Sequence, residues 1–219
     1  MNNKDFLVKG VRVHYPSFFE PRTFQKEDGS VETQSAGAKF LFDPKDLEHK
    51  ASLQAIKAAV HGICQANNPK KDEATGAGRI LPPDQWCLRD GSLTERDELQ
   101  GLWFVSANSP KGTLPFVLDP FDPTKRITDA TQQAKPIYNG CKVNVRFQLW
   151  WQSTSPGRQA RVNAKLIAVQ FAGDGEPIGG GIQTTEQAAQ GFDVAIDPTA
   201  GGHWGDEPAS ATAVTDDEF

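Results

Sequence analysis

Two stretches in the second half of the chain alternate apolar and polar residues with the two-residue period of a β-strand. They are KVNVRFQLWWQ (142–152) and QARVNAKLIAVQF (159–171), separated by the turn STSPGR. This pattern predicts an antiparallel hairpin with one buried face. The predicted outward face carries cations, amides and an indole: Lys142, Asn144, Arg146, Gln148, Trp150, Arg161, Asn163 and Lys165.

Four further elements follow from hydrophobic periodicity. A half-buried strand is predicted from Leu7 to Val13, with Leu7, Val8, Val11 and Val13 as its apolar set and an end at Pro16. Strands are also predicted in AGAKFLF (36–42) and LWFVSA (102–107). Between them, apolar residues at 3.6-residue spacing predict one amphipathic helix over 45–66, with Asp43 as its cap and Pro44 at its first position.

Several short strands with a single helix indicate a mainly β fold, either a small antiparallel barrel or a sandwich. Strands and helices do not alternate regularly, which excludes a doubly wound sheet. The segments 69–101 and 114–136 are predicted to be long loops because they are rich in proline and polar residues. The expected organisation is one domain over residues 1–182 and a flexible acidic tail over 183–219.

The net charge of −5 averages two parts of opposite sign. Residues 1–172 contain 23 Lys and Arg and 18 Asp and Glu, whereas residues 173–219 contain 10 acids and no base. The second part is also poor in Leu, Ile, Val and Phe, which predicts disorder. A basic body with an acidic tail favours polyanion binding with a self-competing appendage.

Motifs for catalysis, cofactors or metals are not found in the sequence. It contains no phosphate-binding loop, no HExxH and no GxSxG, so we expect neither an enzyme nor a cofactor nor a metal site. Asp119 and Asp122 are the nearest approach to a two-metal nuclease, but each precedes a proline, and turn formation is the preferred interpretation.

The cysteines and the N-terminal sequence bear on the compartment. Cys64, Cys87 and Cys141 are widely spaced and are expected to be buried thiols in a reducing cytosol. No segment resembles a signal peptide or a membrane span, so the expected location is the host cytoplasm, without membrane contact.

The remaining candidates for function are outward aromatic and basic residues. Trp150 cannot share the inward face with Trp151, so both stacking on a ligand and plain packing remain open for it. Among Tyr15, Phe18 and Phe19, packing is preferred, and Trp86 and Trp103 are expected in the core. Stacking and phosphate neutralisation together predict sequence-independent binding of single-stranded DNA. The candidate DNA-binding residues are Arg146, Trp150, Arg161, Lys165, Lys142, Lys39 and Tyr15.

An ordered set of short motifs resembles the OB-fold single-stranded DNA-binding proteins of tailed bacteriophages, in a branch formerly catalogued as a domain of unknown function. The motifs are VHYPSFFEPRTF, AKFLFDPKD, LQAIKAA, WCLRDG, LWFVSANS, YNGCKVNVRFQLW and LIAVQFAGDGEPIGGG, between Phe6 and Ile182. The resemblance implies a five-stranded Greek-key barrel with a helix against it and a role in phage replication or recombination. It also implies that the acidic C-terminus, here Asp216, Asp217, Glu218 and Phe219, contacts replication proteins such as a polymerase or a helicase/primase and competes with DNA.

Other functions remain open at this point. Duplex DNA is a possible second ligand, since phosphate contacts carry no strand preference. A phage structural or assembly protein would use the same barrel for protein contacts. A metal-dependent nuclease built on Asp119 and Asp122 is the third reading.

Overall fold

The computed structural model describes residues 4–25, 28–33 and 35–179. The chain divides into two compact units, Met1–Ile182 and Gln183–Phe219, and every described residue belongs to the first. The predicted acidic tail, with Asp216, Asp217, Glu218 and Phe219, therefore lies outside the described residues.

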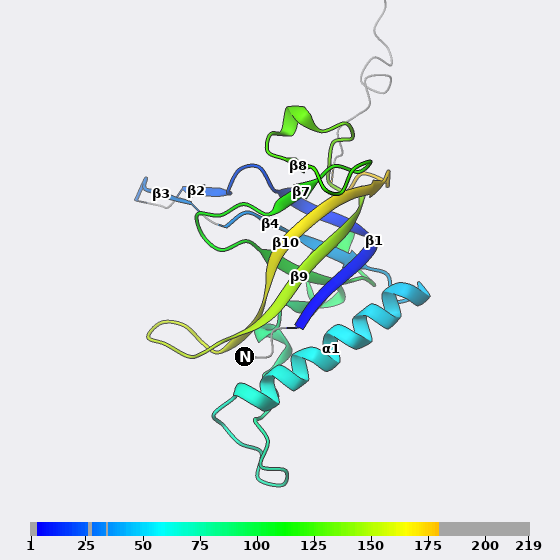
Figure 1. The fold of residues 1–219 in the computed structure, drawn as a ribbon. Helices are drawn as coiled ribbons and strands as arrows, with labels where there is room; N and C mark the ends of the chain where they lie inside the picture. Colours follow the sequence, from blue (N-terminus) through cyan, green and yellow to red (C-terminus); the bar gives the residue numbers. More distant parts are fainter. Residues whose placement is uncertain (1–3, 26–27, 34, 180–219) are drawn as a thin grey trace, which may run out of the picture. The chain divides into compact units, whose positions relative to one another are not determined.

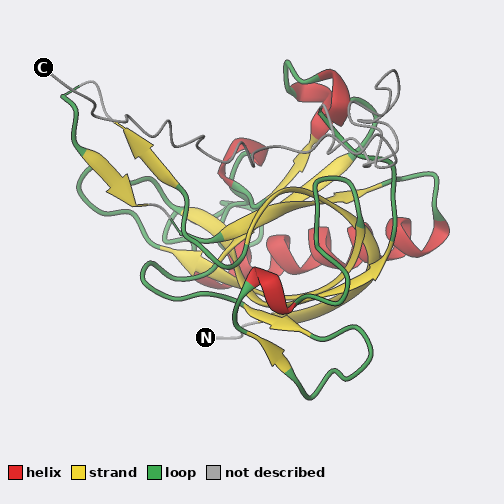
Figure 2. Ribbon diagram, turned by 90° about the horizontal axis from the view of Figure 1, so that it is seen from above, coloured by secondary structure: helices red, strands yellow, loops and turns green. Residues whose placement is uncertain are grey.

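Five strands close into a barrel (Figures 1 and 2). In order around the ring they are β1 (Lys4–Ser17), β4 (Gly37–Phe42), β6 (Trp103–Asn108), β10 (Arg161–Gly173) and β9 (Lys142–Gln152). Neighbours pair antiparallel except β6 and β10, whose short parallel pairing closes the ring. The predicted OB-fold barrel is confirmed, and the sandwich alternative is wrong.

Short strands extend the barrel at its edges. β5 (Leu88–Asp90) pairs with β6. β7 (Phe116–Leu118) pairs parallel to β10 and antiparallel to β8 (Arg126–Ile127). A separate two-stranded sheet joins β2 (Thr23–Gln25) to β3 (Val31–Thr33). Four 3-10 turns complete the described elements: η1 (Pro83–Gln85), η2 (Gly91–Leu93), η3 (Asp97–Leu99) and η4 (Ala130–Gln132). β5, β7 and β8 fall within the predicted loops 69–101 and 114–136, because two or three residues leave no periodicity to detect.

The predicted helix is α1 (Leu47–Asn67), which lies across the ring of strands in Figure 2. Its own residues Ile56, Val60 and Cys64 are buried, and the helix contacts β9, β1, β4 and β10. The predicted cap is wrong: Asp46 accepts hydrogen bonds from the N–H groups of Glu48 and His49. Asp43 instead closes a preceding turn, accepting from Lys45 N at 2.8 Å. None of the described helices combines the length and apolarity needed to cross a membrane.

Strand β1 begins earlier and ends later than predicted, and a bulge divides it. Its register with β9 shifts between Val8 and Val11, and Gly10 adopts a φ of 66° that suits glycine. Val8, Val11 and Val13 are buried, but Leu7 is 56% exposed. The predicted inward position of Leu7 is therefore wrong, because the adjacent residues Leu7 and Val8 point to opposite faces.

The predicted hairpin is confirmed as β9 and β10. Phe147 and Leu149 on β9 and Val162 and Leu166 on β10 point inward and are buried. The register between the strands shifts between Leu166 and Ala168, which leaves Ile167 as an extra residue in β10. The next buried residue of β10 after Leu166 is Val169, whereas regular alternation would give Ala168. The bulge therefore changes which residues of β10 face the core.

All three cysteines are free and buried, as predicted. Burial raises the pKa of each thiol, to about 12 for Cys87 and about 11 for Cys141. They therefore behave as apolar core residues, since the reactive thiolate is disfavoured.

Phe147 occupies the centre of the hairpin's buried face and stacks on Phe6 at 5.6 Å between ring centroids. Phe147→Ala should lower the free energy of unfolding by about 3 to 5 kcal/mol because it leaves a core cavity. Urea denaturation measures this loss. Leu93→Ala is the control, since Leu93 is 82% exposed, and its expected change is within about 0.5 kcal/mol. Equal losses in the two variants would contradict the assigned core.

Candidate functional site

A groove lies between the β9–β10 hairpin and the loop after β6, with a volume of about 590 Å³; we call it the hairpin groove. Trp150 is 39% exposed on its wall, directly opposite Asn163 on β10. Lys165 pairs with Gln148 on one side and with Asn108 of β6 on the other. Lys111, from the loop after β6, and Arg158, from the turn between β9 and β10, also line the groove. An exposed indole thus lies among cations and amides.

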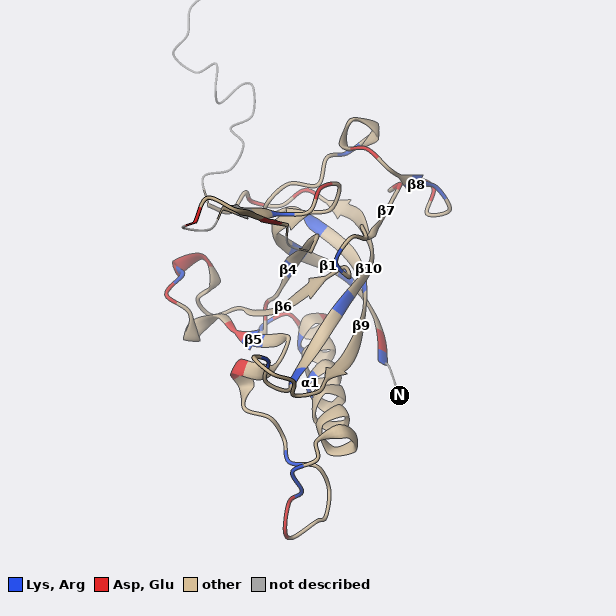
Figure 3. Ribbon diagram, turned by 90° about the vertical axis from the view of Figure 1, so that its left-hand side faces the viewer, with Lys and Arg blue, Asp and Glu red and all other residues tan. Residues whose placement is uncertain are grey.

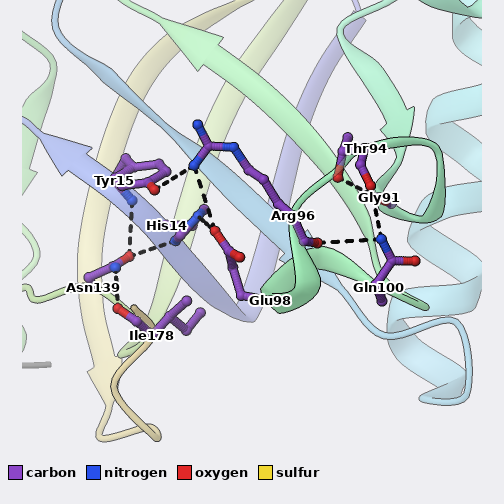
Figure 4. A network of polar contacts seen from close by, with 9 residues as sticks. All are labelled: His14, Tyr15, Gly91, Thr94, Arg96, Glu98, Gln100, Asn139 and Ile178. Atoms are coloured by element: carbon purple, nitrogen blue, oxygen red, sulfur yellow. Dashed lines mark hydrogen bonds and ion pairs between the residues drawn. The ribbon is translucent and has the colours of Figure 1, made fainter. Parts of the chain in front are cut away.

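A second group, the Tyr15 cluster, consists of Tyr15, Arg22, Lys39 and Arg96. Tyr15 is 42% exposed and has two cations near its ring, with Arg96 Cζ at 5.2 Å and Lys39 Nζ at 5.8 Å from the ring centroid. Arg96 also donates to the Tyr15 hydroxyl at 2.5 Å (Figure 4). Both cations therefore make cation–π contacts with the ring of the same exposed residue.

The backbone of Tyr15 is held in an unusual conformation. Its φ of 52° is the one positive φ of a non-glycine residue among those described, and such a conformation costs about 1 to 3 kcal/mol. The Tyr15 N–H donates to Asn139 Oδ1 at 3.0 Å, and its carbonyl accepts from Arg22. Asn139 in turn donates to the Ile178 carbonyl (Figure 4). The surrounding hydrogen bonds therefore fix the direction of the ring.

Positive charges crowd this cluster. The pKa of Lys39 is lowered, first by burial and then by repulsion from Arg96. Glu98 offsets part of the charge, since its Oε1 lies 3.6 Å from Arg96 Nη1. An additional anion would relieve the remaining repulsion.

The hairpin groove and the Tyr15 cluster share one outer surface of the barrel. Lys39 lies directly opposite Ser106 on β6, and directly opposite residues of antiparallel strands share a face. Ser106 also lines the hairpin groove with Trp150 and Lys165. A continuous surface therefore runs from Tyr15 over β4, β6 and β10 to Trp150.

The charge along this path is uneven. β10 carries basic segments, and no acidic residue occurs between Lys142 and Ala172 (Figure 3). Acids are instead concentrated beside Arg96, as Glu95 and, in η3, Asp97 and Glu98. The hairpin side of the path is thus suited to a polyanion.

The remaining predicted DNA-binding residues lie elsewhere. Arg161 is half-buried, and its guanidinium donates to the Asp84 carbonyl at 3.1 Å. Arg146 is exposed on the outer face of β9, four residues from Trp150, in a separate hollow beside β7. Lys142 lies at the opposite end of β9. The pKa of Asp46 is lowered mainly by the hydrogen bond from the His49 N–H, and the charge of Lys142 lowers it further.

The predictions for the other aromatic residues have mixed outcomes. Phe18 and Trp86 are buried, and Phe19 and Trp103 pack partly buried against the core, as predicted. Packing was preferred for Tyr15 as well, and this is wrong. The strand continues through residue 15, and its left-handed backbone places the ring at the surface.

Several residues of the site carry no signal in the sequence. Arg96 stands in TERDELQ among acids, a setting typical of solvated ion pairs. Arg22 and Asn139 act through single hydrogen bonds to the backbone of Tyr15, across seven and more than a hundred residues. Asn163 and Gln148 were on the predicted outward face and do border the groove.

The nuclease candidates Asp119 and Asp122 form turns. Asp119 Oδ1 accepts from the N–H groups of Phe121 and Asp122, and Asp122 Oδ1 accepts from the N–H and hydroxyl of Thr124. Their preferred interpretation as turn residues is confirmed. In the described part of the chain, no group of three or more His, Cys, Asp or Glu residues is arranged to hold a metal ion.

Comparisons with known proteins converge on one family. The model of the family described as Enterobacter phage Enc34, ssDNA-binding protein, matches residues 4–199. Protein p50 of Acyrthosiphon pisum secondary endosymbiont phage 1 is 30% identical over 183 residues, which cover 82% of this chain and 90% of p50.

Two solved structures have a similar fold. The single-stranded DNA-binding protein of bacteriophage Enc34 is 24% identical with a TM-score of 0.61, covering 84% of this chain and 89% of that one. The same phage protein in complex with ssDNA is 26% identical with a TM-score of 0.61, covering 80% and 89%.

His14 provides a test of the network around Tyr15. It is fully buried, its Nδ1 lies 2.9 Å from Asn139 Oδ1, and burial lowers its pKa below the ordinary 6.5. The His14 side chain is therefore protonated more readily in the unfolded chain than in the folded protein. As a result, the free energy of unfolding should fall as the pH drops below about 6.5. Urea denaturation between about pH 5 and 8 measures the slope, and His14→Gln should flatten it. Equal slopes in both proteins would contradict a neutral, buried His14.

Proposed function

The chain belongs to the family of the Enterobacter phage Enc34 ssDNA-binding protein, and on this premise we propose that it binds single-stranded DNA along the hairpin groove and the Tyr15 cluster. The observation that carries the proposal is the single surface on which two exposed aromatic rings, Trp150 and Tyr15, lie among cations. Bases stack on the rings and phosphates approach Lys39, Arg96 and Lys165.

Such a surface binds without sequence preference. Every base has a π-face, so stacking of about 1 to 3 kcal/mol per base does not depend on its identity. Phosphate contacts add a term that weakens with salt and also carries no sequence information. The amides of Gln148 and Asn163 contribute hydrogen bonds, but they are flexible acceptors and donors for any base edge.

The proposed role is non-catalytic, in phage DNA replication or recombination in the host cytoplasm. Asp216, Asp217, Glu218 and Phe219 are proposed to contact replication proteins, such as a polymerase or a helicase/primase, and to compete with DNA. Arg146, Arg161 and Lys142 remain proposed phosphate contacts outside the hairpin groove. Duplex DNA is a proposed weaker ligand, because it offers phosphates but no free base faces.

Trp150→Ala should weaken binding of oligo-dT by about 5- to 150-fold, the equivalent of one lost stacking contact. Fluorescence anisotropy of labelled oligo-dT measures the affinity. Trp150→Phe retains an aromatic face and should restore most of the binding, which separates stacking from damage to the fold. Unchanged affinity in Trp150→Ala would contradict DNA binding in the hairpin groove. Wild-type protein that passes unretained through single-stranded DNA cellulose at low salt would favour a structural role.

Removing residues 201–219 deletes five acids and no base. The truncated protein should bind oligo-dT more tightly at low salt, and the difference should shrink as salt screens the charges. The same anisotropy titration at two salt concentrations measures it. Identical affinities at low salt would contradict competition by the tail and leave DNA binding intact.

A further inference from the structure

A second recess lies on the outer face of the barrel beyond the hairpin groove. It consists of two adjoining hollows of about 580 and 380 Å³, which share Asn144 and Gln170; we call it the β7 groove. Its floor is formed by β1, β9 and β10, and its wall by β7 and the loop that follows. Neither the hairpin groove nor the Tyr15 cluster includes any of its lining residues.

The lining of the β7 groove combines exposed apolar side chains with positive charge. Phe121 is 77% exposed, Leu7 56% and Phe116 48%. Lys9, Lys135 and Arg146 line the same hollows, and none of the described residues that line them is acidic. The nearby carboxylates of Asp119 and Asp122 are engaged in their own turns. Charge complementarity therefore favours an anionic occupant that also offers flat apolar surfaces.

Phe116 has the surroundings of a stacking platform. The guanidinium of Arg126, on the neighbouring strand β8, lies 4.5 Å from its ring centroid. This short distance is within the range of a cation–π contact, which limits the freedom of the ring. The ring nevertheless stays half exposed, so it is supported and available to a ligand at once.

The floor between the hollows is fixed by its own hydrogen bonds. Asn144 Nδ2 donates to Gln170 Oε1 at 3.1 Å, and Gln170 Nε2 donates to the Asp119 carbonyl at 2.9 Å. Gly10 N donates to Asn144 Oδ1 at 3.2 Å. These bonds join β1, β9, β10 and the loop after β7, so the groove is formed before any ligand binds.

The β7 groove continues directly from the hairpin groove. Trp150, Gln148 and Arg146 alternate along the same outer face of β9, with Trp150 lining the first recess and Arg146 the second. These two residues are four positions apart along the strand, a distance of about 13 Å. A chain that leaves Trp150 along β9 thus passes Gln148, which lies opposite Asp5 of β1, and then meets Arg146.

We propose that single-stranded DNA continues from the hairpin groove over Arg146 into the β7 groove, where bases stack on Phe116 and Phe121. This inference rests on the proposed function and extends it, because it assigns a second binding segment. The extended path follows β9 and β10 on the outside of the barrel, and Lys9 and Lys135 receive the phosphates beyond Arg146.

The length of DNA distinguishes the two segments. OB folds contact about 4 to 16 nucleotides each, so oligo-dT of about 6 nucleotides fills one segment and of about 20 spans both. Phe116→Ala should weaken binding of the longer oligonucleotide about tenfold and leave the shorter unchanged, measured by anisotropy. Phe121→Ala, in an exposed loop, should act alike and provides a variant with little risk to the fold. Trp150→Ala should weaken both lengths.

Matched controls remove an exposed apolar side chain or a cation outside both grooves. Leu93→Ala is the control for the phenylalanines. Arg146→Gln should also weaken binding of the longer oligonucleotide, and Lys50→Gln on α1 is its control. Unchanged affinity for the longer oligonucleotide in both Phe116→Ala and Phe121→Ala would overturn the inference and leave the β7 groove to a protein partner. If Trp150→Ala still weakens binding in that case, the proposed function stands. If wild-type protein binds neither length, both fail.

Discussion

The extra residue at Ile167 determines how the barrel closes and where its two grooves lie. Before the bulge, Ala164 and Lys165 of β10 pair with β6 and complete the ring; after it, Ala168 to Gln170 pair with β7. A bulge bends a strand and re-aims its side chains, so one strand serves two partners in succession. The hairpin groove borders the first pairing and the β7 groove the second. Both recesses therefore depend on the same local irregularity.

Elements with long periodic sequences were predictable. The hairpin and α1 repeat their pattern over ten residues or more, and the inward and outward faces of β9 follow from it directly. Leu7 and the helix cap were wrong for a shared reason: a bulge at Gly10 and a turn at Asp43 interrupt the pattern by a residue or two. Such interruptions change the local conformational free energy little. Contacts in the folded structure, and not the sequence pattern, therefore decide where they occur.

The site was only partly predictable for a different reason. Trp150 and Lys165 sit on regular strands, where alternation alone gives their direction. The Tyr15 cluster is assembled from two strands, two loops and an asparagine distant in sequence, joined by hydrogen bonds and cation–π contacts that leave no pattern along the chain. Charge counts could show that cations were in excess, but not that Arg96 would lie over an aromatic ring.

The left-handed backbone at Tyr15 has a consequence for how this position tolerates change. Glycine or asparagine adopts that conformation more readily than tyrosine, so either one would relieve backbone strain at residue 15. Neither would supply the aromatic face that Lys39 and Arg96 approach. Stability and ligand affinity therefore oppose each other at one residue, as they often do in binding sites. A library selected for thermal resistance and one selected for DNA capture would diverge at position 15.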